Sequence, residues 1–459
     1  MFIEKIKSEG LSQLSYLIGG GGKAVVIDPR RDCEIYVEKA AQLGCRITHI
    51  FETHRNEDLV SGAPILAELT GATVYHGPNA AGDVKYAKTA AEGESFKAGE
   101  VRIEVLETPG HTDDSVSYVL YDQSFGDDAV AVCTGDALFV GDVGRTDFYP
   151  DRAKEVAGLL FDSLQKLLTL GDHVYVLPAH GAGSVCGDNM ANRDFSSIGY
   201  ERAHNKMLQI TDRDEFIAAK LDEHHYQPPY FRLMERLNLE GGTPASRVLV
   251  PAPLDLKELR ELAKHSVLVD VRDVTAYLGS HVAGSLALPV GMLASFAGWL
   301  IEPDKQITLI AESDAQAETA ARHLARIGFD NIAGYFALPI PGWAANALSF
   351  DAVSVVGVDE VARRVEERPS GWQLLDVRSQ SEVESGVIEG SRHIYVGHVP
   401  VELESLSRDT HYTVMCASGA RATVAASVLV SQGFNNVDVF MGSMGAWQSE
   451  GHAVADKPA

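Results

Sequence analysis

Three polar side chains in the N-terminal half of the chain follow short apolar runs, at tight turns. They are His54 in ETHRNED, His111 in TPGHTDD and Asp136 in TGDALF. Residues in loops at strand ends can converge on one point although they lie 57 and 25 residues apart in the sequence. Two imidazoles and one carboxylate form the facial set of donors that leaves positions open for substrate and dioxygen on Fe(II). The same donors also bind Zn(II) or Mn(II), so the residue types leave the metal open.

A single thiol in the C-terminal part has a context that favours chemistry. Cys416 ends the apolar run TVM and precedes a short glycine-containing loop and an amphipathic helix. We expect the backbone N–H groups of that loop to point at the sulfur, with the helix N-terminus behind them, which stabilises a thiolate or a bound anion. The loop comprises Ala417, Ser418, Gly419 and Ala420, and Arg421 follows it. The other cysteines are predicted to be inert core residues: Cys33, Cys45, Cys133 and Cys186.

The elements that must position the first three residues belong to a mixed domain. Residues 1–140 contain many short strand-like runs broken by Gly, Asp and Pro, with helical stretches between them. This pattern predicts an α+β or layered β-sandwich domain. Residues 194–238 are rich in Arg, Glu, Leu and His and predict a helical appendage, while the Gly, Pro and Ser content of 239–253 predicts a linker.

The C-terminal half contains an internal repeat. Residues 267–289 are similar to residues 373–395, and a glycine and a tryptophan recur at offsets of 105 and 104. A period of this length is typical of a whole domain. Each copy alternates apolar strands with a helix, which predicts a small α/β domain around a parallel sheet. The predicted domains are 1–242, 243–352 and 353–459.

The composition restricts the class of protein. A length of 459 residues predicts about three domains, and 45% hydrophobic with 22% charged residues is typical of a globular protein. The net charge of −25 repels phosphate backbones and anionic lipids, so we expect neither nucleic acid nor a membrane as partner. From MFIEKIKSEG we expect no secretory signal, and from five scattered cysteines we expect no disulfide framework. We therefore expect a cytoplasmic location.

The first half resembles the metallo-β-lactamase superfamily. The motifs PGHT, TGDALF, GDVGRTDF and PAHG occur in this order within about residues 1–240. The resemblance implies a four-layer αβ/βα sandwich. Dinuclear hydrolases of the superfamily carry a His-x-His-x-Asp-His motif, and the corresponding residues here are His54, Asn56, Asp58 and Leu59. Leu59 binds no metal and Asn56 replaces imidazole poorly, so a two-metal hydrolytic site is disfavoured.

The remaining donors match the persulfide dioxygenase branch of this superfamily. The resemblance implies that His54, His111 and Asp136 hold one Fe(II) per chain, with zinc as the other metal that fits. Five further residues are predicted to orient ligands or to contact substrate: Asp58, Arg145, Asp147, His180 and Tyr230. A structural ion pair is the alternative for Arg145 and Asp147. The segment 224–231, HHYQPPYF, is either a loop that closes over the site or a rigid hydrophobic clasp.

The last domain resembles the rhodanese family. LLDVRSQSEVESGVIEGSRHI and Cys-x-x-Gly-x-Arg are similar to its N-terminal signature and its active loop. The resemblance implies that Cys416 carries a persulfide, and that Arg421 and the loop amides hold the anionic sulfur donor or acceptor. In the middle copy, Ala311 and Gln316 stand at the positions of Cys416 and Arg421. We therefore interpret the middle domain as a structural or docking domain without sulfurtransferase activity.

The whole chain is similar to bacterial fusions of a persulfide dioxygenase with two rhodanese domains. This resemblance implies oxidation of a low-molecular-weight persulfide by dioxygen to sulfite, and exchange of sulfane sulfur with sulfite or thiosulfate through Cys416, in a homo-oligomer that serves sulfide detoxification. One alternative is a thioester hydrolase similar to glyoxalase II, with zinc and His180. Another is a sulfur-trafficking scaffold in which only Cys416 is active. The sequence does not identify the thiol that carries the persulfide.

Overall fold

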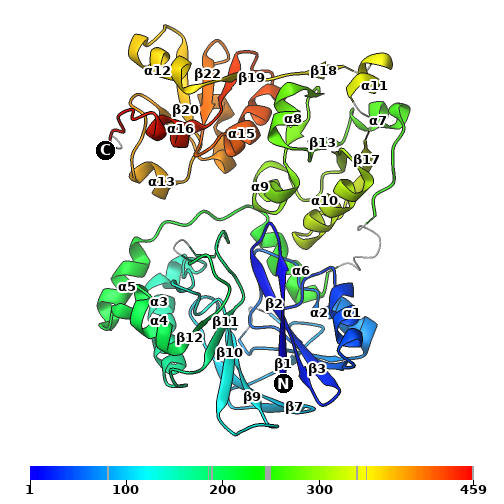
Figure 1. The fold of residues 1–459 in the computed structure, drawn as a ribbon, viewed down its shortest axis with the longest axis vertical. Helices are drawn as coiled ribbons and strands as arrows, with labels where there is room; N and C mark the ends of the chain where they lie inside the picture. The colour runs from blue at the N-terminus through cyan, green and yellow to red at the C-terminus, as the bar shows by residue number, and fades with distance from the viewer. Residues whose placement is uncertain are drawn as a thin grey trace. The chain divides into compact units, whose positions relative to one another are not determined.

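The computed structural model describes residues 1–79, 82–184, 186–187, 190–242, 250–337, 340–347 and 349–456 (Figure 1). The chain divides into two compact units. One comprises Met1–Arg247 with Ala325–Gly328, and the other comprises Val248–Leu324 with Phe329–Ala459. Most of the predicted linker, residues 243–249, lies outside the described residues. The boundaries at 242 and 353 stay predictions.

The first unit is built on two six-stranded sheets. One sheet has the order β1 (Phe2–Ser8), β2 (Gln13–Gly20), β3 (Lys23–Ile27), β4 (Arg46–Phe51), β5 (Thr73–His76) and β6 (Lys88–Thr89). The other has the order β12 (Ser196–Ser197), β11 (Tyr175–Pro178), β10 (Ala129–Gly135), β9 (Val116–Asp122), β8 (Val101–Glu107) and β7 (Ser95–Ala98). The strands β3 to β6 are parallel, whereas β7 to β10 are antiparallel.

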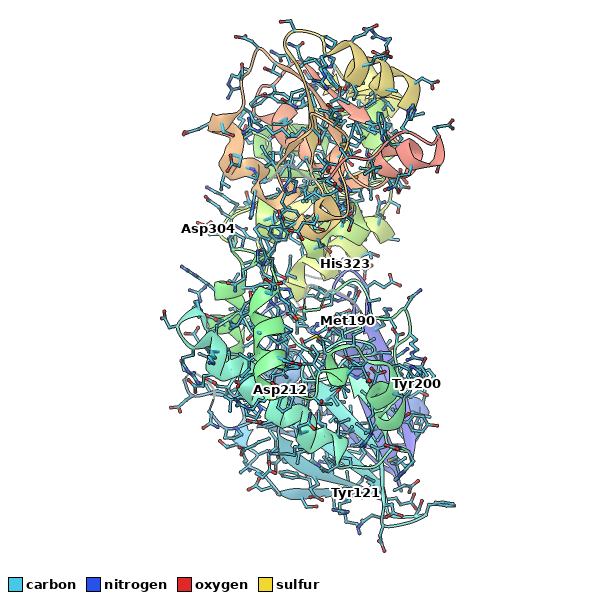
Figure 2. The ribbon with its side chains drawn as sticks, turned by 90° about the vertical axis from the view of Figure 1, so that its left-hand side faces the viewer. Tyr121, Met190, Tyr200, Asp212, Asp304 and His323 are labelled. Carbon is cyan, nitrogen blue, oxygen red and sulfur yellow. The ribbon has the colours of Figure 1, made fainter. Side chains whose placement is uncertain are left out.

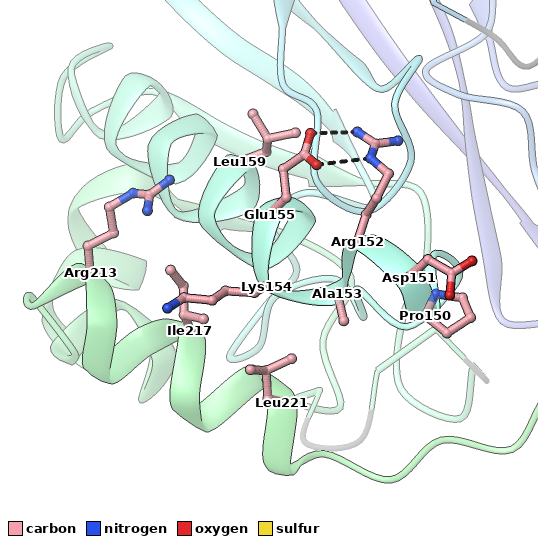
Figure 3. A pocket seen from close by; sticks show the side chains of 10 residues that line it. All are labelled: Pro150, Asp151, Arg152, Ala153, Lys154, Glu155, Leu159, Arg213, Ile217 and Leu221. Atoms are coloured by element: carbon pink, nitrogen blue, oxygen red, sulfur yellow. Dashed lines mark hydrogen bonds and ion pairs between the residues drawn. The ribbon is translucent and has the colours of Figure 1, made fainter.

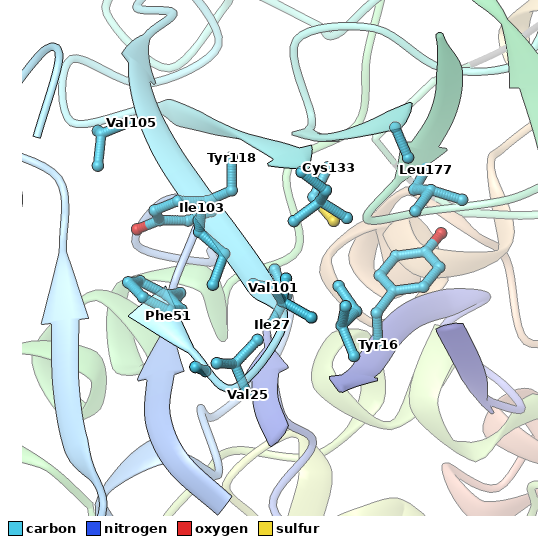
Figure 4. Packing of buried hydrophobic residues seen from close by; sticks show 14 of the residues in the cluster. Tyr16, Val25, Ile27, Phe51, Val101, Ile103, Val105, Tyr118, Cys133 and Leu177 are labelled. Atoms are coloured by element: carbon cyan, nitrogen blue, oxygen red, sulfur yellow. The ribbon is translucent and has the colours of Figure 1, made fainter. Parts of the chain in front are cut away.

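The side-chain period of the strands explains why the two sheets stack. Alternate residues of β8 are buried, so Ile103 faces the interior while Arg102 is half-buried. Phe51 of the first sheet packs against Tyr118 of the second, with ring centroids 4.8 Å apart (Figure 4). Strands β2 and β3 are almost entirely buried, because one face meets the other sheet and the opposite face meets helices.

Helices cover the outer faces of both sheets. The first sheet packs against α1 (Glu34–Gln42) and α2 (Ala63–Thr70), and the second against α3 (Ala153–Leu168), α4 (Ile198–His204) and α5 (Arg213–Asp222). The predicted αβ/βα sandwich is therefore confirmed. The helical appendage contains α4, α5 and α6 (Phe231–Glu240), and also the two-residue strand β12, which was not predicted. The helix α5 begins after Asp212, which is labelled in Figure 2. The Asp212 carboxylate accepts hydrogen bonds from two backbone N–H groups of the first turn.

The second unit contains the two copies of the repeat, and both have a parallel sheet. The first copy has the order β15 (Leu286–Ala287), β13 (Val267–Asp270), β16 (Ile307–Ile310) and β17 (Ile332–Phe336). The second has the order β21 (Arg392–His393), β20 (Trp372–Asp376), β22 (His411–Met415), β23 (Val437–Phe440) and β19 (Ser354–Val356). The strands β14 (His281–Val282) and β18 (Phe350–Asp351) form a separate pair. The order of the first four strands is the same in both copies, so the predicted α/β repeat is confirmed.

Helices complete each copy of the repeat. Those of the first copy are α7 (Leu256–Leu262), α8 (Val274–Gly279), α9 (Leu293–Leu300), α10 (Asp314–Arg326) and α11 (Ile340–Ala345). Those of the second are α12 (Val358–Glu367), α13 (Gln380–Glu384), α14 (Val399–Glu402), α15 (Ala420–Ser431) and α16 (Ser443–Ser449). Within the described ranges, every helix is too short or too polar to cross a lipid bilayer.

The signature Asp-Val-Arg has the same structure in both copies. The Arg272 guanidinium donates two hydrogen bonds to Asp270 and a third to the carbonyl of Ser280. Arg378 donates in the same way to the Asp376 carboxylate. This buried ion pair fixes the turn that follows the central strand, and it explains why the motif persists in the copy that lacks a thiol.

Candidate functional site

The three predicted metal ligands meet at one end of the stacked sheets. His54 lies three residues beyond β4, His111 lies between β8 and β9, and Asp136 directly follows β10. One donor atom from each lies within 4.8 Å of the other two. Asp136 Oδ2 is 3.5 Å from His111 Nε2 and 3.9 Å from His54 Nε2. All three side chains are buried, so the position is screened from bulk water.

Hydrogen bonds set the tautomer of both imidazoles. Nδ1 of His111 is 2.9 Å from the carbonyl oxygen of Arg145, which only accepts, so Nδ1 carries the hydrogen. Nδ1 of His54 is 2.9 Å from the Thr53 hydroxyl, which itself donates to Asp28 at 2.8 Å. The Thr53 oxygen is then an acceptor for His54 Nδ1–H. In both rings the lone pair is left on Nε2, the atom that faces Asp136.

The donor set fits a divalent transition metal. His111 Nε2 is buried and has no hydrogen-bond partner among the described residues, although such an atom normally has one. Burial lowers the pKa of His54 to about 4, so its imidazole is neutral at neutral pH. Burial raises the pKa of Asp136, but the neighbouring imidazoles of His180 and His54 outweigh it and hold the pKa below its ordinary value. Two imidazole nitrogens and one carboxylate oxygen are therefore gathered where one ion could bind them.

His180 and Asp58 lie directly behind this set. His180 Nδ1 is 2.8 Å from Asp136 Oδ1, and its Nε2 is 3.0 Å from Asp58 Oδ2. The imidazole thus bridges the two carboxylates and fixes the orientation of Asp136, which is the kind of supporting role that the sequence predicts for it.

Cys186 lies beside His180 and Asp58, although the sequence predicts an inert core thiol there. The three residues form a second buried group whose donor atoms are all within 4.8 Å of one another. Burial raises the pKa of the Cys186 thiol well above its usual value. Its short spacing from His180, six residues, is the signal that points to this neighbourhood.

Arg145 and Asp147 form an ion pair that also holds the segment 224–231. The Arg145 guanidinium donates two hydrogen bonds of 2.6 Å to Asp147 and one of 3.1 Å to the carbonyl of Tyr226. Burial raises the pKa of Asp147, but the Arg145 hydrogen bonds lower it to about 2. The Arg145 carbonyl also orients His111. The ion pair therefore connects the segment 224–231 to His111, one of the three predicted metal ligands.

Tyr230 is buried, and its hydroxyl donates to the carbonyl of Asp58 at 2.9 Å. The next residue, Phe231, lies against Phe148, whose ring is edge-on to His111 with centroids 5.2 Å apart. These contacts favour the rigid clasp over the closing loop. Tyr230 therefore holds the backbone of the loop that carries Asp58.

A buried histidine that the sequence analysis missed joins the two ligand-bearing loops. His76, the last residue of β5, lies between Glu52 at 3.0 Å and Asp114 at 2.6 Å. Asp114 also accepts the backbone N–H of Arg55, the residue after His54. Burial lowers the pKa of His76, but the hydrogen bonds to Asp114 and Glu52 raise it to about 10. An imidazolium thus connects the His54 loop to the His111 loop.

Cys416 occupies a loop of the expected form between β22 and α15. The backbone N–H of Gly419 donates to Cys416 Sγ at 3.1 Å, and the N–H of Cys416 donates to the Ser443 hydroxyl at 3.1 Å. Gly419 has φ of 113°, and a Cβ there would lie 2.6 Å from Met441 Sδ, so only glycine fits. Ala417 and Ser418 accept hydrogen bonds through their carbonyl groups from Gly445 and Gly442. Ala420 is the first residue of α15.

The structure places Arg421 on a carboxylate. Its guanidinium donates two hydrogen bonds of 2.6 Å to Glu382 of α13. Burial lowers the pKa of Arg421, while Glu382 and, to a smaller extent, Cys416 raise it. Glu382 also completes the cap of α13 with Ser379. The sequence analysis did not identify Glu382 as the partner of Arg421.

The same position in the middle copy has no nucleophile. Ala311 follows β16, and the Gln316 side chain accepts a hydrogen bond of 2.8 Å from the backbone N–H of Glu312. The loop is therefore closed by its own side chain. The absence of sulfurtransferase activity in this copy stays a prediction.

A surface cavity of about 730 Å³ lies between α3 and α5, lined by residues that include Arg152, Lys154 and Arg213 (Figure 3). Arg152 is paired there with Glu155. None of the predicted site residues lines this cavity. This cavity is therefore separate from the candidate sites described above.

Comparisons with known proteins match both halves of the chain. The pattern of the Metallo-beta-lactamase superfamily matches residues 9–180, and that of the Rhodanese-like domain matches residues 253–346 and 358–450. Persulfide dioxygenase ETHE1, mitochondrial, of Mus musculus is 32% identical over 245 residues, covering 50% of this chain and 86% of the relative. A solved metallo-beta-lactamase from Staphylococcus aureus is 29% identical with a TM-score of 0.66, and the match covers 73% of this chain and 98% of that one.

Two other relatives match single parts. The "Probable hydroxyacylglutathione hydrolase glo2" of Schizosaccharomyces pombe is 35% identical over 154 residues, covering 33% of this chain and 56% of the relative. The "Putative sulfurtransferase YtwF" of Bacillus subtilis is 40% identical over 77 residues, covering 17% of this chain and 74% of the relative.

The bridge made by His76 predicts a measurable loss of stability on substitution. In His76→Leu, the Glu52 and Asp114 carboxylates face each other without a cation, and we expect the free energy of unfolding to fall by about 3–5 kcal/mol. Urea unfolding of the metal-free protein measures this change. His204→Leu, at an exposed histidine of α4, is the matched control and should change little.

The same bridge predicts a pH dependence. The pKa of His76 is raised from 6.5 to about 10 by folding, so its stabilising effect is complete below about pH 6.5 and is lost as the pH rises through about 10. The urea midpoint of the wild type should fall between pH 7 and pH 10, and that of His76→Leu should fall less. Equal pH profiles for the two proteins would contradict the bridge.

Gly144 tests whether backbone packing holds the metal-ligand candidates in place. A Cβ at Gly144 would lie 1.9 Å from the Asp136 carbonyl oxygen and 3.3 Å from His111 Cβ. We expect Gly144→Ala to weaken metal binding at least about 10-fold in a chelator competition assay. Gly126→Ala is the control, because a Cβ there would meet no atom within 4 Å. Unchanged metal affinity in Gly144→Ala would show that the loop tolerates displacement.

Proposed function

Because the chain belongs to the ETHE1 family of the metallo-beta-lactamase superfamily and continues into two rhodanese-like domains, we propose that it couples a persulfide dioxygenase to a sulfurtransferase. In the first reaction a low-molecular-weight persulfide, dioxygen and water give the free thiol, sulfite and two protons. The outer sulfur loses four electrons and dioxygen gains them. The observation that carries the proposal is the convergence of His54, His111 and Asp136 with both imidazole lone pairs on Nε2.

The donor set would hold one Fe(II) per chain. Bound there, Fe(II) supplies the electron path between spin-paired sulfur and triplet dioxygen. His180 keeps the Asp136 carboxylate in its orientation, and Thr53 and the Arg145 carbonyl keep the two imidazoles in theirs. Phe148 packs beside His111, and Phe231 packs against Phe148, so both rings exclude water from that side.

The second reaction uses Cys416. Its thiolate attacks the outer sulfur of thiosulfate, the bond between the two sulfur atoms breaks, and sulfite leaves with the bonding electron pair. The reverse reaction returns sulfane sulfur from the Cys416 persulfide to sulfite. The Gly419 N–H, which already donates to Sγ, and the N-terminus of α15 stabilise the negative charge on sulfur in both directions.

A zinc-dependent thioester hydrolase is the second candidate for the first domain. The group formed by Asp58, His180 and Cys186 favours it, because these donors lie next to the first set, and the similarity to glo2 agrees. Against it, the positions that carry two further histidines in dinuclear hydrolases hold Asn56 and Leu59. The dioxygenase needs only the first set of donors, so we favour it.

The metal and its reaction test the first activity. Anaerobically purified protein should contain about one iron per chain and consume oxygen when a persulfide is added. His54→Ala should lose the iron and at least about 100-fold of the oxygen uptake, because one of three protein ligands is gone. His204→Ala is the control and should retain both. Stoichiometric zinc with thioester cleavage would support the hydrolase, and the absence of metal would support a scaffold.

Cys416→Ser tests the division between the two activities. The variant should take up oxygen at a rate within about 2-fold of the wild type and form no thiosulfate, since the serine hydroxyl is a poor sulfur nucleophile. Cys45→Ser, at a half-buried cysteine, is the matched control and should retain both activities. Loss of oxygen uptake in Cys416→Ser would contradict separate sites.

A further inference from the structure

The middle copy of the repeat lacks a nucleophile, yet it packs against the elements that hold Cys416. Both copies belong to the same compact unit. Helix α15, which begins directly after the Cys416 loop, packs against β15 and α8 of the middle copy. The 3-10 turn η5 (Val396–His398) packs against α9 of the middle copy on one side and against α15 on the other.

The first contact is a hydrogen bond between strand and helix. The backbone N–H of Ala287, on the edge strand β15, donates to the Ser427 hydroxyl of α15 at 2.9 Å. The Ser427 hydroxyl is buried and donates in turn to the Val424 carbonyl of its own helix at 2.6 Å. The middle copy thereby fixes the position of α15 relative to the sheet of the middle copy. The loop before α15 supplies the Gly419 N–H that reaches Cys416 Sγ.

The second contact is between Trp299 of α9 and Gly397 of η5. A Cβ at Gly397 would lie 2.5 Å from Trp299 Cδ2, so the indole rests directly on the glycine backbone. Tyr395 and His398 pack edge-on around the same indole, with ring centroids 5.6 and 5.4 Å away. Gly291 of PVGM is the equivalent of Gly397 in YVGH, and a Cβ at Gly291 would meet no atom within 4 Å.

The turn that Trp299 covers is connected to the thiol through the backbone. The N–H of Val396 donates to the carbonyl of Val377, and the N–H of Val377 donates to the carbonyl of Met415, the residue before Cys416. Burial lowers the pKa of Arg421, Glu382 and Cys416 raise it, and Tyr395 is close enough to raise it further. Movement of this turn would therefore displace the strand end that carries the nucleophile.

We propose that the nucleophile-free repeat is a positioning domain for sulfur transfer, in which Trp299 and the Ala287–Ser427 hydrogen bond hold the turn 395–398 and α15 in the geometry that Cys416 needs. Trp299 acts through Gly397 and Tyr395 and is a positioning residue. The inference rests on the proposed sulfurtransferase activity of Cys416.

Loading of Cys416 with sulfur from thiosulfate tests the proposal in the full-length protein. Intact-mass measurement over time follows the gain of one sulfur atom. Trp299→Ala should reduce the loading rate at saturating thiosulfate about 10-fold and leave persulfide-dependent oxygen uptake unchanged. Trp299→Phe should recover most of the rate, because a flat aromatic ring can still cover Gly397. Oxygen uptake reports on the first unit alone, so an unchanged circular dichroism spectrum is the check that the second unit of each variant is folded.

The two equivalent glycines provide the matched control. Gly397→Ala should slow loading about as much as Trp299→Ala, whereas Gly291→Ala should load at the wild-type rate. The double variant Gly397→Ala with Trp299→Ala should be no slower than Trp299→Ala alone, because removing the indole relieves the contact. Wild-type loading rates in both Trp299→Ala and Gly397→Ala would overturn the proposal, as would equal slowing by Gly291→Ala.

The positioning role can also be measured without sulfur transfer. The rate of Cys416 alkylation by iodoacetamide should change in Trp299→Ala and Gly397→Ala and stay constant in Gly291→Ala. If the wild type is not loaded by thiosulfate, the sulfurtransferase function fails, and the alkylation rates alone then decide the positioning role. If the wild type is loaded, but Trp299→Ala changes neither the loading rate nor the alkylation rate, the positioning role fails while the sulfurtransferase function stands.

Discussion

The candidate metal centre depends on a buried imidazolium between two carboxylates. His76 links Glu52, which precedes the His54 loop, to Asp114, which follows His111. Each carboxylate has further donors: Ser61 and Tyr86 for Glu52, and the backbone of Arg55 for Asp114. A buried ion is stable only when its polar atoms find hydrogen-bond partners, and each of these three side chains has at least two. The hydrogen bonds of His76 and Asp114 therefore join the two loops that carry the imidazole donors.

The Cys416 loop is held in place by backbone hydrogen bonds and a glycine rather than by a buried ion. Its backbone is hydrogen-bonded to the turn before α16 on one side, and Gly419 fits only because it lacks a Cβ. In both sites the reactive atoms lie at strand ends, and hydrogen bonds from outside the reacting group fix their orientation. Residues at strand ends are held more precisely than residues on long loops, so they suit reactions in which the sulfur atom must lie at a set distance from its ligands and hydrogen-bond donors.

The extent to which the sequence predicts these sites depends on how local each contact is. His54, His111, Asp136 and Cys416 each follow an apolar strand directly or by a short turn, so their convergence follows from strand order. His76 also ends a strand but stands in no motif, and Cys186 is marked only by its six-residue spacing from His180. Their roles arise from the pairing of β5 with β4 and from the path of the chain after His180, which are long-range features. The ion pair of Arg421 with Glu382 likewise joins two elements 39 residues apart.

The hydrogen bond from Ala287 to Ser427 has a consequence for how the repeats behave apart. β15 lies at the outer edge of its four-stranded sheet, and an uncovered edge strand recruits strands from other molecules. Helix α15 of the other copy occupies that edge. A chain truncated between the copies would uncover β15, and we expect such a chain to aggregate. The supporting copy therefore depends on the reactive copy for its solubility.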